Sequence, residues 1–265
     1  MLQFTSGSTS DPKGVQLPHR TIGANLDALA TAAALDVERD VLVSWLPLYH
    51  DMGLVGLLTT AMTNGADLVL GAPQDFLAAP GRWMEWISTF GGTATAGPNF
   101  AWVLAGRALK KGPQLDLSSL RVALNGAEPV DADAVEAFVA IAEQHGMRPG
   151  AVFPAFGMAE LAIAGTFPEP LAGLRTDTVD GRVLETEGYA APVEAGAANA
   201  RRLALLGRPV PGLEIRVVDP VTGAVRQDRE SGELEIRGTS VTPGYYERPD
   251  ANADLFRDDS PERRG

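Results

Sequence analysis

The chain has 265 residues, of which 45% are hydrophobic and 21% charged, a balance typical of a packed globular protein rather than a disordered chain. Its net charge of −12 and its isoelectric point of about 4.7 argue against a nucleic-acid partner, which requires a basic surface. The lack of cysteine excludes disulfides, and the sequence has neither an apolar run of the ~18 residues that cross a bilayer nor a signal-peptide start, so we expect no transmembrane segment and a cytoplasmic location.

The first feature in chain order is the stretch from Thr5 to Val15, TSGSTSDPKGV, which is almost free of apolar side chains. Its glycines let the backbone turn N–H groups inward, its hydroxyl side chains add donors, and Lys13 adds a mobile positive charge. Convergent donors and a cation suit the phosphates of a nucleotide, although the spacing is not the GxxxxGK[ST] of a Walker A loop. The alternative is a disordered Ser/Gly linker. We favour phosphate binding because a helix pattern follows almost at once.

Helix and strand patterns then alternate along residues 1–168. Apolar residues at helical spacing predict helices over 18–35, 54–62, 80–90, 100–109 and 131–145. Short apolar runs predict strands over 40–45, 66–70, 93–96, 120–124 and 151–154. Asp131 is a candidate cap for the last helix. The alternation predicts an α/β fold with a mainly parallel sheet and flanking helices.

The pattern changes in the last third of the chain. Residues 169–204 have no clear period, which predicts a loop or an insertion. Residues 205–256 predict a smaller β-rich subdomain, with strands at 213–218 and 232–237. The polar tail 257–265 is expected to be disordered.

Five stretches, in this order, resemble the adenylate-forming (ANL) superfamily of AMP-dependent synthetases and ligases. They are TSGSTSDPKGV at 5–15, LPLYHDMGL at 46–54, NGAEPV at 125–130, FPAFGMAEL at 153–161, and GELEIRG with TPGYY at 232–246. Five ordered matches across most of the chain argue against chance agreement. YHDMGL and NGAEPV resemble the fatty acyl-AMP ligases most, and those enzymes make acyl-adenylates and commonly pass them to a carrier-protein thiol.

The resemblance implies ATP-dependent activation of a fatty acid to acyl-AMP with release of pyrophosphate, and Mg²⁺ that bridges phosphate oxygens. Transfer to an acyl carrier protein of a polyketide or peptide synthetase would follow. One alternative is a fatty acyl-CoA synthetase, whose acceptor is coenzyme A. The unpatterned stretch 171–202 favours the acyl-AMP ligases, which carry an extra insertion. An alternative of a different class is a non-catalytic nucleotide-binding remnant.

The resemblance makes residues 1–168 the expected nucleotide- and acyl-binding region and implies a role for each motif. Contacts to the β- and γ-phosphates fall on Thr5, Ser6, Gly7, Ser8, Thr9 and Lys13. The nucleotide pocket falls on Gly126, Ala127, Glu128, Phe156, Gly157 and Met158. Glu160 is the expected magnesium ligand. The expected catalytic set is His50, Lys13 and Glu160, with His50 at the mouth of the acyl site, where it would steer the carboxylate.

Several of these residues have a plainer interpretation. Lys13 taken alone fits a solvated surface lysine, Phe156 fits core packing, and His50 fits a structural histidine. Asp51 either fixes the His50 imidazole or caps the helix that follows it.

The implied reaction is the attack of a carboxylate on the α-phosphorus of ATP. Both reactants are anions, so catalysis must neutralise phosphate charge and align the carboxylate. The acyl chain needs an apolar wall, for which GPNFAW at 97–102, Trp45 and Met52 are candidates. Ordinary core packing is the alternative for each of them.

The resemblance stops near the end of the chain. In complete relatives the PGYY motif is followed by a Gly-Trp stretch and by Thr-Gly-Asp, whose aspartate holds the ribose hydroxyls, whereas this chain continues as NADLFRDDSPERRG. The small C-terminal domain with its catalytic lysine and the segment before the phosphate loop have no counterpart. We therefore expect a large-domain fragment, truncated at both ends, whose adenylation activity is impaired.

Overall fold

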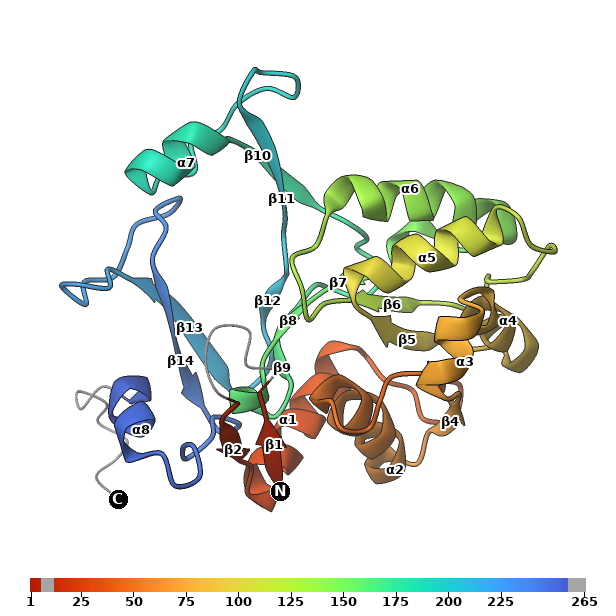
Figure 1. Ribbon diagram of the computed structural model, residues 1–265, viewed down its shortest axis with the longest axis horizontal. Coiled ribbons are helices and arrows are strands. Elements are labelled where there is room, and N and C mark those ends of the chain that lie inside the picture. The colour runs from red at the N-terminus through yellow and green to blue at the C-terminus, as the bar shows by residue number, and fades with distance from the viewer. Residues whose placement is uncertain (6–11, 257–265) are drawn as a thin grey trace.

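The computed structural model describes residues 1–5 and 12–256, and its centre is a five-stranded sheet (Figure 1). The strands lie in the order β4-β3-β5-β6-β7 and span Val41–Ser44 (β3), Asp67–Leu70 (β4), Ala94–Gly97 (β5), Val122–Asn125 (β6) and Val152–Pro154 (β7). Every pairing between these strands is parallel. The predicted α/β fold with a parallel sheet is therefore confirmed.

Helices cover both faces of this sheet, as is usual for parallel sheets. They are α1 (His19–Ala32), α2 (Thr60–Asn64), α3 (Pro73–Ala78), α4 (Gly81–Phe90), α5 (Asn99–Leu109) and α6 (Ala132–Ala142). Helices α5 and α6 lie on one face and α1 lies on the other (Figure 1). In the part of the chain that the structure describes, none of the helices is long and apolar enough to cross a membrane.

Side chains alternate between the two faces of a strand, so both faces of the sheet carry buried clusters. On the first face, Val43 and Ala123 belong to a cluster with Trp83 of α4 and Trp102 of α5. On the second face, Val122 packs in a cluster with residues of α1 and of the segment after β7.

The helix predicted over 54–62 begins earlier, as a π-helix over Met52–Thr59 that runs into α2. The Asp51 carboxylate caps it by accepting the Met52 N–H at 2.7 Å. At Gly53 a Cβ would lie 2.5 Å from the Pro47 carbonyl oxygen, so glycine allows this first turn to pack against the preceding loop. π-Helices are frequent at functional sites, and this one lines a large cavity.

The remaining strands pair antiparallel. They are β1 (Leu2–Phe4) with β2 (Gly14–Gln16), β9 (Ala164–Phe167) between β8 (Phe156–Gly157) and β12 (Arg208–Pro209), and β13 (Leu213–Val218) with β14 (Glu233–Gly238). The strands predicted at 213–218 and 232–237 are confirmed as β13 and β14. A short helix, α8 (Pro249–Leu255), follows them.

Residues 169–204, predicted as a loop or an insertion, are not a loop over much of their length. The segment contains β10 (Thr176–Asp180), α7 (Gly181–Glu187) and β11 (Ala200–Ala204), with β10 and β11 paired antiparallel. The β10–β11 ribbon extends away from the parallel sheet (Figure 1). Arg202 of β11 forms ion pairs with Asp133 and Glu136 of α6. The ribbon is thus attached through exposed charges, which leave no hydrophobic period in the sequence. The division of the chain into 1–168, 169–204 and 205–256 remains a prediction, and the tail 257–265 lies outside the described residues.

Replacement of the Asp131 cap should destabilise α6. The Asp131 carboxylate accepts the N–H groups of Asp133 and Ala134 at 2.9 and 3.1 Å. We expect Asp131→Ala to lower the free energy of unfolding by about 1 kcal/mol, because two N–H groups of the first turn lose their acceptor. Asp131→Asn retains a capping oxygen and is the matched control, with urea unfolding followed by circular dichroism as the measurement. Equal losses in the two variants would contradict a capping role.

Candidate functional site

A cavity of about 1030 Å³ lies along the face of the sheet that α1 covers. Side chains of β3, β5 and β6 form one side of it, and α1 and β9 contribute to the other. It contains the following predicted site residues: Thr5, His50, Gly126, Ala127, Phe156, Gly157, Met158 and Glu160. The fold therefore brings residues of four of the five motifs into one cavity.

The fifth motif, TPGYY, reaches the same place through Tyr245. The Tyr245 hydroxyl donates a hydrogen bond to Glu160 Oε1 at 2.6 Å. On its other side the Lys13 Nζ lies 5.1 Å from the centroid of the Tyr245 ring, a cation–π distance. Lys13 does not line the cavity itself, but Tyr245 contacts both residues, with Lys13 over its ring and Glu160 at its hydroxyl.

Backbone contacts fix Tyr245 in this position. The N–H of Gln16 donates to the Gly244 carbonyl at 2.9 Å, and the N–H of Tyr246 donates to the Gly14 carbonyl at 2.8 Å. The Tyr245 N–H donates to Asn252 Oδ1 at 2.6 Å. Tyr245 is therefore held against β2 and α8 by hydrogen bonds that do not involve its side chain.

Tyr245 is a proton donor at any physiological pH. Burial of the phenol and its hydrogen bond to the Glu160 carboxylate raise the pKa of Tyr245 well above its usual range. A neutral phenol positions the Glu160 carboxylate without cancelling its charge. The TPGYY motif contains Tyr245 and is the sequence signal for it, but the sequence alone gives this residue no role. The structure identifies its bond to Glu160.

The described residues include only the two ends of the predicted phosphate loop. Thr5 and Lys13 form the neck of the loop, where the Thr5 N–H donates to the Lys13 carbonyl at 3.0 Å and the Lys13 N–H donates to Thr5 Oγ1 at 3.1 Å. The strands β1 and β2 continue from this neck as an antiparallel pair. The other predicted phosphate ligands, Ser6, Gly7, Ser8 and Thr9, lie outside the described residues.

His50 and Asp51 form a bonded pair at the cavity. The His50 Nδ1 lies 2.7 Å from Asp51 Oδ1, and the same oxygen accepts the Met52 N–H. The hydrogen bond to Asp51 raises the pKa of His50, and this effect outweighs the opposing effect of partial burial. Asp51 therefore does both things proposed for it, since it orients the imidazole and caps the π-helix.

Gly126 and Ala127, which directly follow β6, border the cavity. At Gly126 a Cβ would lie 2.9 Å from the Ala155 carbonyl oxygen, so glycine permits the close approach of β6 and the segment after β7. Ala127 has a φ of 68°, the left-handed region that non-glycine residues seldom adopt. The Phe156 side chain is half-buried and borders the cavity, which differs from the core packing considered as its alternative.

Two sequence expectations differ from the structure. Glu128, predicted in the nucleotide pocket, does not border the cavity, because its Oε1 accepts the Phe100 N–H at 2.7 Å at the start of α5. Of the candidate acyl wall, Met52 lines the cavity, whereas Trp45 and the run 97–102 do not. Trp45 instead stacks on Phe76 at 3.7 Å between ring centroids, in the core on the other face of the sheet.

The donor set suits a magnesium ion that is shared with a phosphate. No group of three His, Asp or Glu side chains within the described residues is arranged to hold a metal ion. Glu160 is a single carboxylate in the cavity, and Mg²⁺ is commonly bound by one or two carboxylates together with substrate phosphate oxygens. The site therefore fits Mg²⁺ only if a phosphate completes its coordination.

Comparisons with known proteins identify a family and similar structures. Residues 1–246 match the family model described as AMP-binding enzyme. The chain is 46% identical over 248 residues to Rv1013 of Mycobacterium tuberculosis, covering 92% of this chain and 45% of that protein. It is 33% identical over 258 residues to the medium-chain-fatty-acid–[acyl-carrier-protein] ligase JamA of Moorena producens, covering 96% and 43%.

A solved structure of the same kind is also similar. The fatty acyl-adenylate ligase from L. pneumophila, in complex with acyl adenylate and pyrophosphate, superposes with a TM-score of 0.89 and 31% identity, covering 95% of this chain and 44% of that one. This chain thus spans about half the length of the relatives that it matches.

The His50–Asp51 pair predicts a histidine that stays protonated to a higher pH than usual. We expect His50 to titrate above the ordinary histidine value of about 6.5, because Asp51 stabilises the imidazolium. In Asp51→Asn the titration should return toward that value, while the amide oxygen retains the helix cap. Histidine resonances followed by NMR across the pH range measure both. A His50 titration unchanged by the substitution would show that Asp51 does not set its pKa.

Proposed function

This chain belongs to the AMP-binding enzyme family, and from that premise we propose that it binds ATP and a fatty acid and serves their condensation to fatty acyl-AMP with release of pyrophosphate. The observation that carries the proposal is the shared cavity. One end of it holds His50, Glu160 and the backbone of Gly126, and the remainder continues as an apolar channel along the sheet. A carboxylate on an apolar chain and a nucleotide phosphate can meet only where those two surfaces join.

The charges at this end suit the meeting of two anions. The His50 imidazolium would steer the incoming carboxylate. Lys13 lies over the ring of Tyr245, whose hydroxyl is bonded to Glu160, and from there it would contact the phosphates. Mg²⁺, when bound, supplies charge neutralisation at the phosphate oxygens. Glu160 would hold that ion, and Tyr245 would orient Glu160. Electrostatic stabilisation of this kind is usually the largest contribution to catalysis.

The nucleotide base has a surface of its own in the cavity. Gly126 and Ala127 present backbone there, and Phe156 presents one side of an aromatic ring. A flat adenine can lie between a backbone segment and such a ring, with stacking that favours offset geometry. Gly157 and Met158 border the same part of the cavity and complete the proposed nucleotide contacts. Glu128 has no nucleotide contact in this proposal, because it does not border the cavity and its carboxylate accepts the Phe100 N–H.

We propose an acyl carrier protein of a polyketide or peptide synthetase as the acyl acceptor. The support is the similarity to JamA, which is named as a ligase for an acyl carrier protein, and to a fatty acyl-adenylate ligase. Coenzyme A is the competing acceptor. We also place the reaction in the cytoplasm, where the sequence already predicted the protein to be. Transfer assays with the two acceptors distinguish an acyl-AMP ligase from an acyl-CoA synthetase.

Nucleotide binding tests the proposal on this chain directly. We expect ATP with Mg²⁺ to raise the melting temperature, because a ligand at 100 times its Kd stabilises the folded state by about 2.7 kcal/mol. The Glu160→Gln variant should lose the difference between ATP with Mg²⁺ and ATP with a chelator, since its side chain no longer carries the charge that holds the ion. Calorimetric titration measures the two affinities.

The matched control is Glu128→Gln, which removes the carboxylate of another motif, one that does not border the cavity. It should retain the magnesium dependence of the wild-type chain. If ATP with Mg²⁺ does not change the melting temperature of the wild-type chain, the result would instead support the alternative of a non-catalytic remnant. Retained magnesium dependence in Glu160→Gln would remove Glu160 from the proposed metal site.

A further inference from the structure

The cavity has two chemically different ends. Among the described residues that line it, the acidic and basic side chains are His50, Asp51, Glu160 and Arg121. The first three lie at the end where we place the phosphates. Arg121 directly precedes β6, so it lies at the opposite, amino-terminal edge of the sheet. The reaction proposed for the first end gives Arg121 no role.

The wall between the two ends is apolar and follows the strand register. Leu42, Ala94 and Val122 pair across β3, β5 and β6 in one row and line the cavity. Ala96 and Leu124 form the next row toward the carboxyl ends of the strands. Along four residues of β6 the channel runs roughly 13 Å, at about 3.3 Å per residue.

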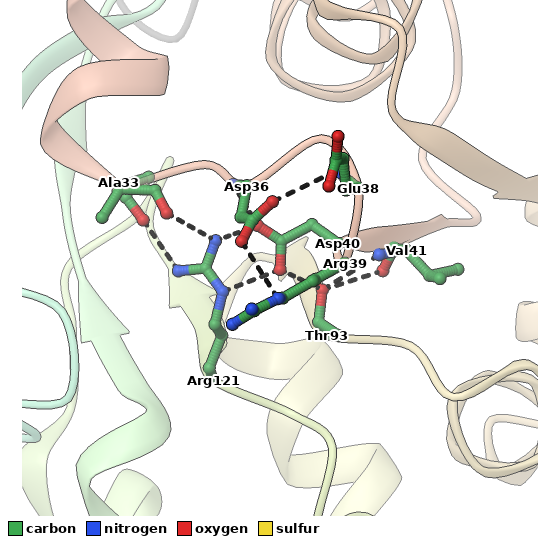
Figure 2. Close-up of polar contacts among 9 residues, drawn as sticks. Ala33, Asp36, Glu38, Arg39, Asp40, Val41, Thr93 and Arg121 are labelled. Atoms are coloured by element: carbon green, nitrogen blue, oxygen red, sulfur yellow. Dashed lines mark hydrogen bonds and ion pairs between the residues drawn. The ribbon is translucent and has the colours of Figure 1, made fainter.

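A bonded group of side chains lies at the amino-terminal end of this channel (Figure 2). Arg121 Nε donates to Asp40 Oδ1 at 2.8 Å, and Arg121 Nη2 bonds the other carboxylate oxygen. Arg121 also donates to the carbonyl oxygens of Ala33 and Ala34, at 2.8 and 3.1 Å. Thr93 Oγ1 donates to Asp40 Oδ1 at 2.7 Å. We call Arg121, Asp40 and Thr93 the distal cluster.

The distal cluster joins four elements at one point. Asp40, Thr93 and Arg121 each directly precede a strand, namely β3, β5 and β6, and the Ala33 carbonyl follows the end of α1. Figure 2 shows the loop between α1 and β3 passing on the far side of the cluster from the sheet. Ala33 and Leu35, which flank the carbonyls that Arg121 bonds, also line the cavity.

An apolar chain end cannot displace this cluster at low cost. The Asp40 side chain is 2% exposed and that of Arg121 is 18% exposed. Burial alone would raise the pKa of Asp40, but the bonds from Arg121, Thr93 and the Asp36 N–H outweigh it and hold that pKa below its usual range. Separation of a buried ion pair leaves an uncompensated charge, and a methyl group offers no bond in exchange.

We propose that Arg121, held in place by Asp40, ends the apolar channel and sets the longest acyl chain that the site accepts. The inference rests on the proposed fatty-acid function. Each added methylene buried in the channel should raise affinity by about fourfold until the chain end reaches Arg121. A longer chain must either break the distal cluster or withdraw its carboxylate from His50, so affinity should fall beyond that length.

Binding of saturated fatty acids of increasing length to the whole chain tests the proposal, with displacement of a fluorescent fatty acid as the readout. The wild type should show a maximum in affinity at one chain length. Asp40→Ala with Arg121→Ala removes both charges together, and its maximum should move to longer chains. Ala94→Leu fills the last row of the channel without touching the cluster, and its maximum should move to shorter chains.

The control is Arg202→Ala, which removes another ion-paired arginine, on the surface between β11 and α6, and should leave the maximum unchanged. Melting temperatures report whether each variant folds. If the double variant does not fold, the shift expected for Ala94→Leu still tests the proposal. A maximum shared by the wild type, the double variant and Ala94→Leu would overturn the role of Arg121 while leaving fatty-acid binding intact. Failure of every fatty acid to bind, with ATP binding retained, would overturn the acyl assignment itself and this inference with it.

Discussion

Parallel pairing of the central strands is the constraint on which the rest of the structure depends. Because β3, β5, β6 and β7 run in one direction, their carboxyl ends share one edge of the sheet and their amino ends share the other. Polar and titratable side chains follow the carboxyl ends of these strands, which is where open α/β sheets generally bind their ligands. A channel along one face therefore begins among polar groups and ends at the residues that precede the strands.

The same constraint explains why a single cavity has two unlike surfaces. Backbone and titratable groups at the carboxyl edge suit a nucleotide, and the apolar rows behind them suit an aliphatic chain. Register fixes how far the apolar rows extend, because Ala94 pairs with both Leu42 and Val122. The position of Arg121 at the far edge is a consequence of that pairing rather than of any local motif.

In this acidic chain, the charge that the cavity presents depends on the partner of each charged side chain and not on the net charge. Arg121 is neutralised by Asp40, so it adds bonds and bulk to the cavity but no free positive charge. Lys13 lies over the Tyr245 ring, and the Tyr245 hydroxyl holds Glu160, so a neutral residue separates a cation from a carboxylate. Both charges are the ones that we propose for a phosphate and its metal ion, in a chain whose net charge is −12.

The sequence by itself determined the alternation of elements, the parallel sheet, the Asp131 cap and the family, because these depend on local period, local polarity and short ordered motifs. Only the tertiary structure decided which face each side chain joins. Trp45 faces a core instead of the cavity, Glu128 is bonded to Phe100, and β10 and β11 pair without a hydrophobic period. It also decided that Tyr245 meets Glu160 and that Arg121 meets Asp40. The physical reason is that such contacts join segments far apart in the chain, and their geometry depends on strand register and packing, which no local pattern records.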